Sequence, residues 1–383
     1  MKKTIILTGA RAPVAVDLAR SFCTAGYETH LADSVTPWAA RCLRPRVPIY
    51  RLASPRHTFP EFRRDLVKLV EQLDPTWIIP TCEEVFWLSE AAARDGYSDR
   101  VFAPSLPLLR RLHSKFDFAE LARSGGVLVP DTWVVSSPEE LTEVPLSASE
   151  MVLKPEFSRF STETIIRPNS GEIRRVVPSE ARRWVAQRFI EGIEVCSWAA
   201  VRDGTVVAFT AYRPIWRHGR AAIAFAAVHL HSVAEVSRRI AAVTDMTGHL
   251  SLDLIVTPEG SAIPIECNPR ATSGVHLMDA DPTMAAAIVG EGIAPIPPEG
   301  RLRYLGPAMI FLGIPSPFVP AQMRAFLRDL RRGGDVIGRS GDRLPVLGAL
   351  ADAVRFAAMG LVDRRSMAGQ TTEDIEWNGE KIG

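Results

Sequence analysis

The sequence predicts an α/β protein in which a parallel sheet is followed by segments richer in β-strands. The first 110 residues alternate short β-rich runs with amphipathic runs, which is typical of a parallel sheet covered by helices. From about Val127 the pattern changes to short β runs joined by turns. A chain of 383 residues is long enough for two to three domains of about 150 residues each.

The N-terminal alternation can be assigned element by element. Val14, Leu18 and Phe22 recur at helical spacing after the turn at Gly9–Pro13. The pattern predicts strands over Thr4–Thr8, Glu28–Ala32 and Trp77–Pro80, and helices over Val14–Thr24 and Phe62–Leu73.

Short β runs dominate the middle of the chain. The Asp-Gly pair at positions 203–204, between two such runs, is a strong signal for a hairpin. A helix is expected over Val233–Thr247, and the proline-rich stretch Ile293–Gly300 indicates a boundary. The predicted strands are Thr132–Val135, Met151–Lys154, Thr164–Arg167, Glu194–Val201 and Thr205–Arg213.

Composition and charge exclude several classes of protein. Hydrophobic residues make up 46% and charged residues 23%, which excludes disordered, collagen-like and coiled-coil chains. The net charge of +1 gives no reason to expect a nucleic-acid partner, and no apolar run reaches the roughly 18 residues of a membrane helix. The five cysteines are odd in number and never form a CxxC pair, so we expect reduced thiols and a cytoplasmic protein.

The segment Leu250–Arg270 carries the most chemical information. With its turn at Pro258–Ser261, the predicted hairpin places Asp253 directly opposite Glu266, and Asn268 points the same way. The other face is predicted to be apolar, through the pairs Leu252 with Cys267, Leu254 with Ile265, and Val256 with Ile263.

Two carboxylates directly opposite each other repel unless a positive charge lies between them. Two carboxylates and an amide oxygen suit Mg²⁺, which commonly keeps coordination positions for water and substrate phosphates. The alternative is a hairpin whose polar end is only solvated, which is the commoner case for an arbitrary Asp/Glu pair. The Asn-Pro-Arg that follows Glu266 favours the metal site.

The motif Glu-Cys-Asn-Pro-Arg at residues 266–270, with Asp253 thirteen positions before its glutamate, resembles the metal-binding motif of the ATP-grasp superfamily. It is most similar to the form found in carbamoyl-phosphate synthase large chains and biotin carboxylase. The resemblance implies that Asp253, Glu266 and Asn268 hold two Mg²⁺ ions, or Mn²⁺ in their place, against the phosphates of ATP. It also implies that Arg270 is catalytic and contacts the transferred phosphate or a substrate anion.

Two lysines agree with this resemblance. The chain has only six lysines beside 39 arginines, so their positions carry information. Lys115, in Ser-Lys-Phe-Asp, and Lys154, in Val-Leu-Lys-Pro, match the two family lysines that contact ATP phosphates, and Lys154 would also act in catalysis. Taken one at a time, each could be an ordinary surface lysine.

A third match is the segment Gln187–Glu194, which resembles the family's linker between its two ATP-binding subdomains. The resemblance implies that the backbone of Arg188 and Ile190 binds the adenine edge and that Glu194 binds the ribose hydroxyls. It also assigns Gln187 to the nucleotide site. Without its neighbours, the segment would be interpreted as a strand followed by a glycine turn.

The chain departs from the family pattern in two places. The loop after Lys154 contains no glycine, so phosphate binding by bare backbone amides is in question. Ser251 stands where ligases of the D-alanine type have an arginine, which argues against their oxyanion arrangement. The alternative phosphate donors in the loop are Ser158, Arg159, Ser161 and Thr162.

Candidate substrate residues are assigned from their charge and their position along the chain. Arg213, Arg217, His218 and Arg220 form a cationic cluster between two β runs, where Arg213 and Arg217 are candidates for binding a carboxylate. Glu83 follows a predicted strand of the N-terminal sheet and is a further candidate, with a solvated loop as the alternative.

The resemblance implies an ATP-grasp fold in four segments. These are an N-terminal parallel-sheet domain (1–110), a β-rich central subdomain (111–190), a C-terminal α+β nucleotide-binding subdomain (191–295) and an appended region (296–383). ATP would lie between the central and C-terminal subdomains. A homodimer is compatible with the family.

The activity implied is ATP-dependent ligation of a small-molecule carboxylate to an amine through an acyl phosphate, with release of ADP and phosphate. Three alternatives stay open. A phosphotransferase would share every ATP-site residue, and a nucleotide sensor without turnover is compatible with the glycine-free loop. A nicotinamide oxidoreductase is disfavoured, because the second and third glycines of a dinucleotide motif are missing after Gly9.

Overall fold

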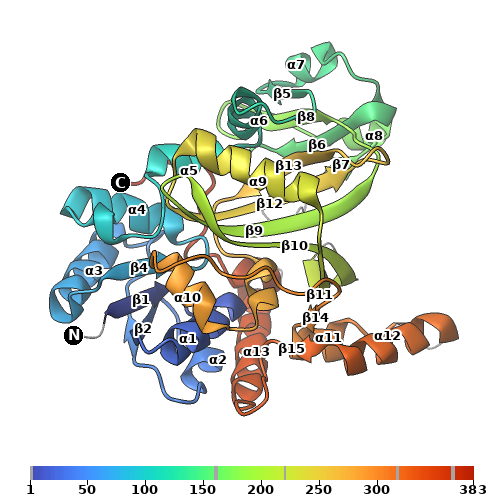
Figure 1. Ribbon diagram of the computed structural model, residues 1–383. Coiled ribbons are helices and arrows are strands. Elements are labelled where there is room, and N and C mark those ends of the chain that lie inside the picture. The colour runs from blue at the N-terminus through green and yellow to red at the C-terminus, as the bar shows by residue number, and fades with distance from the viewer. Residues whose placement is uncertain (1–2, 159–162, 220, 316–318, 364–366) are drawn as a thin grey trace.

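The structure, a computed structural model, describes residues 3–158, 163–219, 221–315, 319–363 and 367–383. These residues form three β-sheets with helices packed on and between them (Figure 1). The N-terminal sheet lies at one end of the molecule, the largest sheet crosses its middle, and a small sheet lies at the opposite end.

The N-terminal sheet is parallel and has the strand order β3-β2-β1-β4. Its elements are β1 (Thr4–Thr8), α1 (Pro13–Thr24), β2 (Glu28–Asp33), α2 (Trp38–Arg41), β3 (Ile49–Arg51), α3 (Phe59–Leu73), β4 (Trp77–Pro80) and α4 (Val85–Asp95). Side chains alternate across β1, so Ile5 and Leu7 pack with α1 on one face, while Ile6 packs with α3 and α4 on the other. The predicted parallel sheet with helices on both faces is confirmed.

The order in which strands are added to this sheet changes side between β1 and β4. Strands β2 and β3 lie on one side of β1, and β4 lies on the other. In open parallel sheets, ligands bind beyond the carboxyl ends of the strands at such a point. Residues that follow β1 and β4, Glu83 among them, therefore lie where a substrate is expected.

The small sheet is antiparallel and has the order β5-β8-β6-β7. Leu153 and Ala186 are completely buried in its core, together with Trp184 and Val135. The elements of this part are α5 (Leu106–His113), α6 (Lys115–Ser124), β5 (Thr132–Val135), α7 (Pro138–Glu143), β6 (Met151–Pro155), β7 (Ile165–Ile166), α8 (Ser170–Ile173) and β8 (Trp184–Arg188).

The largest sheet has seven strands in the described residues, in the order β13-β12-β9-β10-β11-β14-β15. Its elements are β9 (Ile193–Arg202), β10 (Thr205–His218), β11 (Ala221–Val228), α9 (His231–Thr244), β12 (Gly248–Val256), β13 (Ala262–Asn268), β14 (Leu302–Tyr304) and β15 (Gly334–Asp335). Val233 and Ile240 of α9 pack on Leu250 and Leu252 of β12, so α9 covers one face of the sheet (Figure 1). The Asp-Gly hairpin predicted at positions 203–204 connects β9 to β10.

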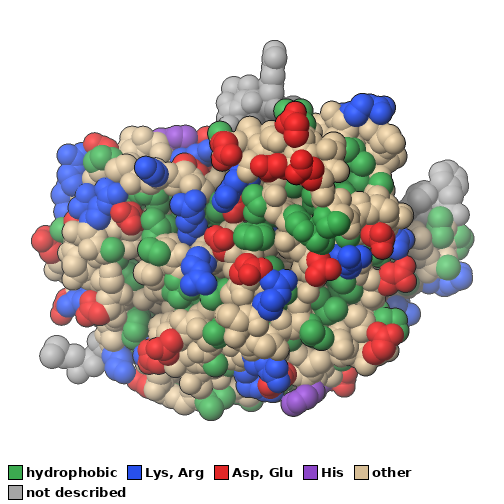
Figure 2. Space-filling model, turned by 90° about the horizontal axis from the view of Figure 1, so that it is seen from above, with side chains coloured by type: hydrophobic (Ala, Val, Ile, Leu, Met, Phe, Trp, Pro, Cys, Tyr) green, Lys and Arg blue, Asp and Glu red, His purple; other side chains and the backbone are tan. Residues whose placement is uncertain are grey.

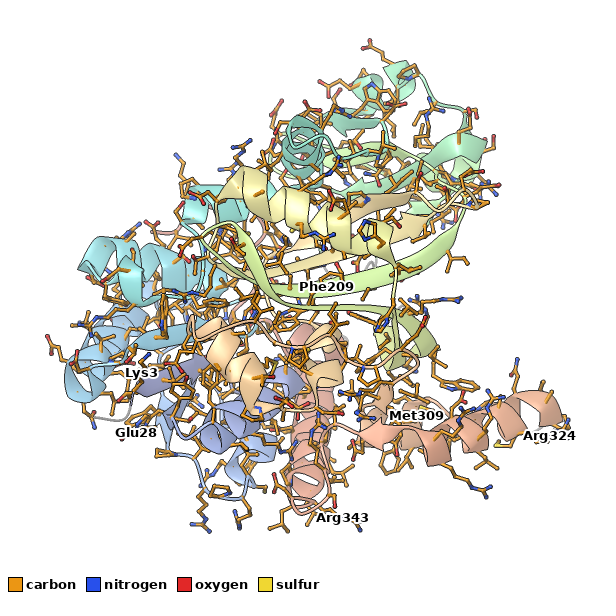
Figure 3. The ribbon with its side chains drawn as sticks, in the orientation of Figure 1. Lys3, Glu28, Phe209, Met309, Arg324 and Arg343 are labelled. Carbon is orange, nitrogen blue, oxygen red and sulfur yellow. The ribbon has the colours of Figure 1, made fainter. Side chains whose placement is uncertain are left out.

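The C-terminal region completes structures begun earlier in the chain. Strand β14 pairs with β11, and α13 packs against α2 so closely that Gly348 lies on the backbone of Trp38. Helices α11 and α12 form an arm that projects from the body, with Met309 at its base and Arg324 near its outer end (Figure 3). The helices here are α10 (Pro282–Ile288), α11 (Gly306–Leu312), α12 (Pro320–Arg332), α13 (Pro345–Asp363) and α14 (Met367–Gln370). The predicted segment boundaries stay predictions.

The surface agrees with the balanced charge of the sequence. On the face shown in Figure 2, acidic and basic side chains are interspersed and no single sign of charge dominates. Within the described residues, no helix combines the length and the apolar character that crossing a membrane requires.

Candidate active site

Two carboxylates face each other on the hairpin of β12 and β13. Asp253 pairs with Glu266, as the sequence predicts, and Ser251 pairs with Asn268. The Asn268 amide nitrogen lies 3.5 Å from a carboxylate oxygen of Asp253. The three side chains proposed as metal ligands therefore lie together at one end of the hairpin.

The register changes by one residue immediately after Asp253. A β-bulge adds one residue, Ile265, to β13, and such a residue is left out of the ladder. The pairs predicted beyond this point are wrong: Leu254 pairs with Pro264, not Ile265, and Val256 pairs with Ala262, not Ile263. As a result the buried face of β13 is formed by Ala262 and Pro264, while Ile263 and Ile265 are half-buried.

The bulge supplies the hydrogen-bond acceptor for Lys154. The Nζ atom of Lys154, on β6, donates to the carbonyl of Ile265 at 2.9 Å. Lys154 is only 3% exposed, and burial lowers its pKa to about 8, although the negative charge of Glu266 opposes this shift. One buried lysine thus connects the small sheet to the edge of the large sheet.

Lys115 approaches the same carboxylate from another element. It is the first residue of α6 and is 1% exposed. Its Nζ atom lies 3.8 Å from a carboxylate oxygen of Glu266 and donates to the carbonyls of Glu156 and Ser158, both at 3.3 Å. Both lysines that the sequence singles out therefore surround Glu266, and Lys115 also holds the start of the glycine-free loop.

The electrostatics of the carboxylate pair favour a cation. Burial and, after it, the negative charge of Glu266 raise the pKa of Asp253 to about 6. The donor set fits Mg²⁺, because it consists of two carboxylates and an amide. The described residues contain no cluster of three or more His, Cys, Asp or Glu side chains suited to a metal, and the amide of Asn268 would be the third donor beside the two carboxylates.

Arg270 is held by the N-terminal domain. Its Nε atom donates to a carboxylate oxygen of Glu83 at 2.6 Å, and its Nη2 atom donates to the side-chain oxygen of Asn268 at 3.3 Å. Glu83 is 1% exposed and lies just after β4. The structure thus gives Glu83, a substrate candidate in the sequence, a direct partner in Arg270.

Cys196 and Tyr212 were missed by the sequence analysis. Tyr212 of β10 pairs with Cys196 of β9, which pairs with Asp253 of β12, so the three residues share one face of the sheet. Arg213 follows Tyr212, lies on the opposite face and is exposed. The structure therefore does not bring Arg213 to the carboxylate pair. The pattern that places Cys196 here becomes visible only once the strand order is known.

The predicted ribose contact is occupied by an arginine. Arg217 forms an ion pair with Glu194 at 2.7 Å, and both side chains are partly exposed. The structure therefore places Arg217 at the predicted nucleoside end of the site. Of the other residues in its cluster, Arg220 lies outside the described residues, and His218 is exposed.

The predicted adenine contacts lie at the end of β8. The N–H of Arg188 already donates to the carbonyl of Asp131 at 2.8 Å, so only its carbonyl remains for a base. In the part of the chain that the structure describes, the N–H of Ile190 has no acceptor. Gln187 is buried and donates from its side chain to Thr132 at 3.1 Å, which fixes the strand and does not offer its amide to a ligand.

The glycine-free loop is described only at its start. The hydroxyl of Ser158 donates to the carbonyl of Pro155 at 3.4 Å. The other predicted phosphate donors, Arg159, Ser161 and Thr162, lie outside the described residues.

The linker requires a glycine at position 192. A Cβ atom there would lie 2.4 Å from the carbonyl oxygen of Val256.

No model of a known protein family matches the chain, and a comparison with curated protein sequences finds no match. Solved structures do resemble it. A carboxyaminoimidazole ribonucleotide synthase from Aspergillus clavatus complexed with ATP is 13% identical, with a TM-score of 0.62, over 79% of this chain and 81% of that one. The similarity to this and related structures, together with the three sheets described above, identifies the fold. The chain has the ATP-grasp fold.

Two further ATP-grasp structures resemble the chain. A phosphoribosylamine–glycine ligase from Thermotoga maritima is 15% identical, with a TM-score of 0.59, over 78% of each chain. An L-amino acid ligase from Bacillus licheniformis is 13% identical, with a TM-score of 0.54, over 75% of this chain and 74% of that one. At these identities the similarity establishes the ATP-grasp fold, and the chemistry must be argued from the site.

Proposed function

We propose that this ATP-grasp protein is an ATP-dependent ligase that joins a small-molecule carboxylate to an amine. The observation that carries the proposal is the convergence of Lys115 and Lys154 on the pair formed by Asp253 and Glu266. The proposal is supported by solved structures of the same fold, which include an amino acid ligase and a phosphoribosylamine–glycine ligase.

Asp253, Glu266 and the amide of Asn268 would hold Mg²⁺. When bound, Mg²⁺ supplies positive charge that neutralises the ATP phosphates and the phosphoryl group in transfer. The raised pKa of Asp253 supports this assignment, because burial and the negative charge of Glu266 both disfavour the ionised carboxylate, and a bound cation would offset both effects.

The chemistry takes two steps. An oxygen of the substrate carboxylate attacks the terminal phosphorus of ATP, and the bond from that phosphorus to ADP breaks, which gives an acyl phosphate. The nitrogen of the amine then attacks the carbonyl carbon, phosphate leaves, and the nitrogen loses a proton. Neither step requires a nucleophilic side chain, so the protein acts by positioning and by fixed charge.

Three cations of the chain have assigned roles in these steps. Lys115 and Lys154 are held by backbone carbonyls and present positive charge to the phosphates of ATP. Arg270 is oriented by Glu83 and presents its guanidinium to the phosphoryl group in transfer or to the substrate carboxylate. Because these groups are fixed before the substrate binds, they need little reorganisation during the reaction.

The nucleoside is oriented at the other end of the site. The free N–H of Ile190 and the carbonyl of Arg188 match the acceptor and donor on an adenine edge. Glu194 binds the ribose hydroxyls once Arg217 has released it, so ATP binding includes the opening of this ion pair.

The test is product analysis with MgATP and pooled carboxylic acids, with and without pooled amines, and with hydroxylamine to trap an acyl phosphate. ADP and a hydroxamate are expected, and the Glu266→Gln variant should form neither while keeping the wild-type circular dichroism spectrum. AMP and pyrophosphate would refute the mechanism. Bound ATP that yields no ADP would favour a nucleotide sensor, and a stable phosphorylated product in the presence of amines would favour a phosphotransferase.

A further inference from the structure

The last thirteen residues, 371–383, which we call the strap, return to the N-terminal domain and end beside α4 and α5 (Figure 1). They form turns and contain neither helix nor strand. Their ordered path therefore depends on contacts with other parts of the chain.

The strap is fixed to the N-terminal domain through its backbone. The indole N–H of Trp87 donates to the carbonyl of Ile375 at 3.0 Å, and the guanidinium of Arg94 donates to the carbonyls of Ile382 and Gly383 at 2.7 and 2.8 Å. Bonds of this kind hold a particular backbone path, because they depend on carbonyl positions more than on side-chain identity.

A buried ion pair fixes the start of the strap. Arg11 lies just after β1, its side chain is almost completely buried, and it binds the carboxylates of both Asp33 and Asp374. Arg11 also donates to the carbonyl of Thr371 at 3.0 Å. The strap thus begins at the carboxyl end of β1, where the parallel sheet is expected to meet a substrate.

Trp377 brings the strap into contact with the loop that follows Lys154. It is 1% exposed, its ring stacks on Phe86 at 4.7 Å between centroids, and it meets Phe157 edge-on at 5.4 Å. A Cβ atom at Gly379 would lie 2.8 Å from the ring of Phe157, so the strap backbone passes directly over this ring. Phe157 is therefore in contact with the strap through both Trp377 and Gly379.

The same loop is also held by groups of the active site. Lys115 binds the carbonyls of Glu156 and Ser158, which flank Phe157, and the hydroxyl of Ser114 donates to the carboxylate of Glu156 at 2.6 Å. Residues of both the loop and the strap line a cavity of about 1300 Å³. A displacement of Phe157 would move both carbonyls that bind Lys115.

We propose that Trp377 is a positioning residue for nucleotide binding, acting through Phe157 on the loop that follows Lys154. A glycine-rich loop can adapt its backbone to the phosphates, whereas this loop has no glycine, and its described start, Glu156–Ser158, is placed by contacts with the strap and Lys115. The inference rests on the proposed function, since it takes ATP to be the ligand of this loop.

The test is calorimetric titration of the full-length protein and its variants with MgATP. Trp377→Ala and Phe157→Ala should each weaken ATP binding by about tenfold, whereas Trp377→Phe should keep most of the affinity. Both changes break the same contact. The double variant should therefore lose no more ATP affinity than the single variant that binds ATP more weakly. In turnover, the KM for ATP should rise in Trp377→Ala while kcat at saturating ATP stays within about twofold.

Ile382→Ala is the matched control, because Ile382 is a buried residue of the same strap outside the aromatic cluster. It should lower the melting temperature and leave ATP affinity unchanged. The inference is overturned if folded Trp377→Ala or Phe157→Ala binds ATP as the wild type does, or if their losses multiply in the double variant. A wild-type protein that binds no ATP would instead overturn the proposed function and this inference with it.

Discussion

Replacing Lys154 with methionine is predicted to stabilise the nucleotide-free protein and to abolish ATP turnover. Burial lowers the pKa of Lys154 from 10.5 to about 8. At about 1.4 kcal/mol per pKa unit, holding the buried ammonium costs about 3 kcal/mol below pH 8. Methionine removes this cost but leaves the carbonyl of Ile265 without a donor, which costs about 1 kcal/mol. The expected net gain at pH 7 is about 2 kcal/mol.

The stability difference between the wild type and Lys154→Met should change with pH in a defined direction. Because the pKa of Lys154 is lower in the folded state, the unfolded chain binds more protons at this residue between about pH 8 and 10.5. The wild-type protein should therefore gain stability relative to Lys154→Met as the pH rises through this range. The advantage of the variant should vanish by about pH 10.5.

The assay is urea denaturation of both proteins at pH 7 and at pH 10, without nucleotide, together with ATP turnover. Lys68→Met is the control, since Lys68 is an exposed lysine on α3, and it should change stability by less than about 0.5 kcal/mol. The reasoning is refuted if Lys154→Met is no more stable than the wild type at pH 7, or if its advantage is the same at both pH values.

Three further outcomes follow from the site. The affinity of the nucleotide-free protein for Mg²⁺ should fall as the pH drops through about 6, because a proton on Asp253 competes with the ion; calorimetry in two buffers of different ionisation enthalpy should show proton release. Glu83→Gln should lower kcat at least about tenfold with little change in the KM for ATP, because it loosens Arg270; equal kcat values would contradict this. Gly192→Ala should lower stability by about 2 kcal/mol in thermal unfolding, since the added Cβ atom collides with the carbonyl of Val256.

The central pair of the site could be predicted because it depends on local rules. A strand alternates its side chains with a period of two, and the apolar residues of β12 and β13 fix which face is buried. These rules place Asp253 opposite Glu266, as the structure has them. The bulge at Ile265 could not be predicted from the same rules, because the apolar residues on both sides of it are compatible with either strand register.

Contacts between distant segments could not be predicted in this way. The ion pair of Arg270 with Glu83 joins residues 187 positions apart, and the contact of Trp377 with Phe157 joins the end of the chain to its middle. Neither leaves a periodic pattern in the sequence. Arg217 shows the same difficulty: its charge indicates an anion partner, and only the folded sheet identifies Glu194 as that partner.

Strand β14 has a consequence for any attempt to study part of the chain. It pairs with β11 through Ala224, Phe225 and Ala226, in a strand whose eight residues are all apolar. A shortened chain ending at residue 295 would lose β14 and expose β11 as an uncharged edge. Such edges recruit strands from other molecules and lead to aggregation. The part of the protein that carries the candidate site should therefore be expressed together with its C-terminal region if it is to stay in solution.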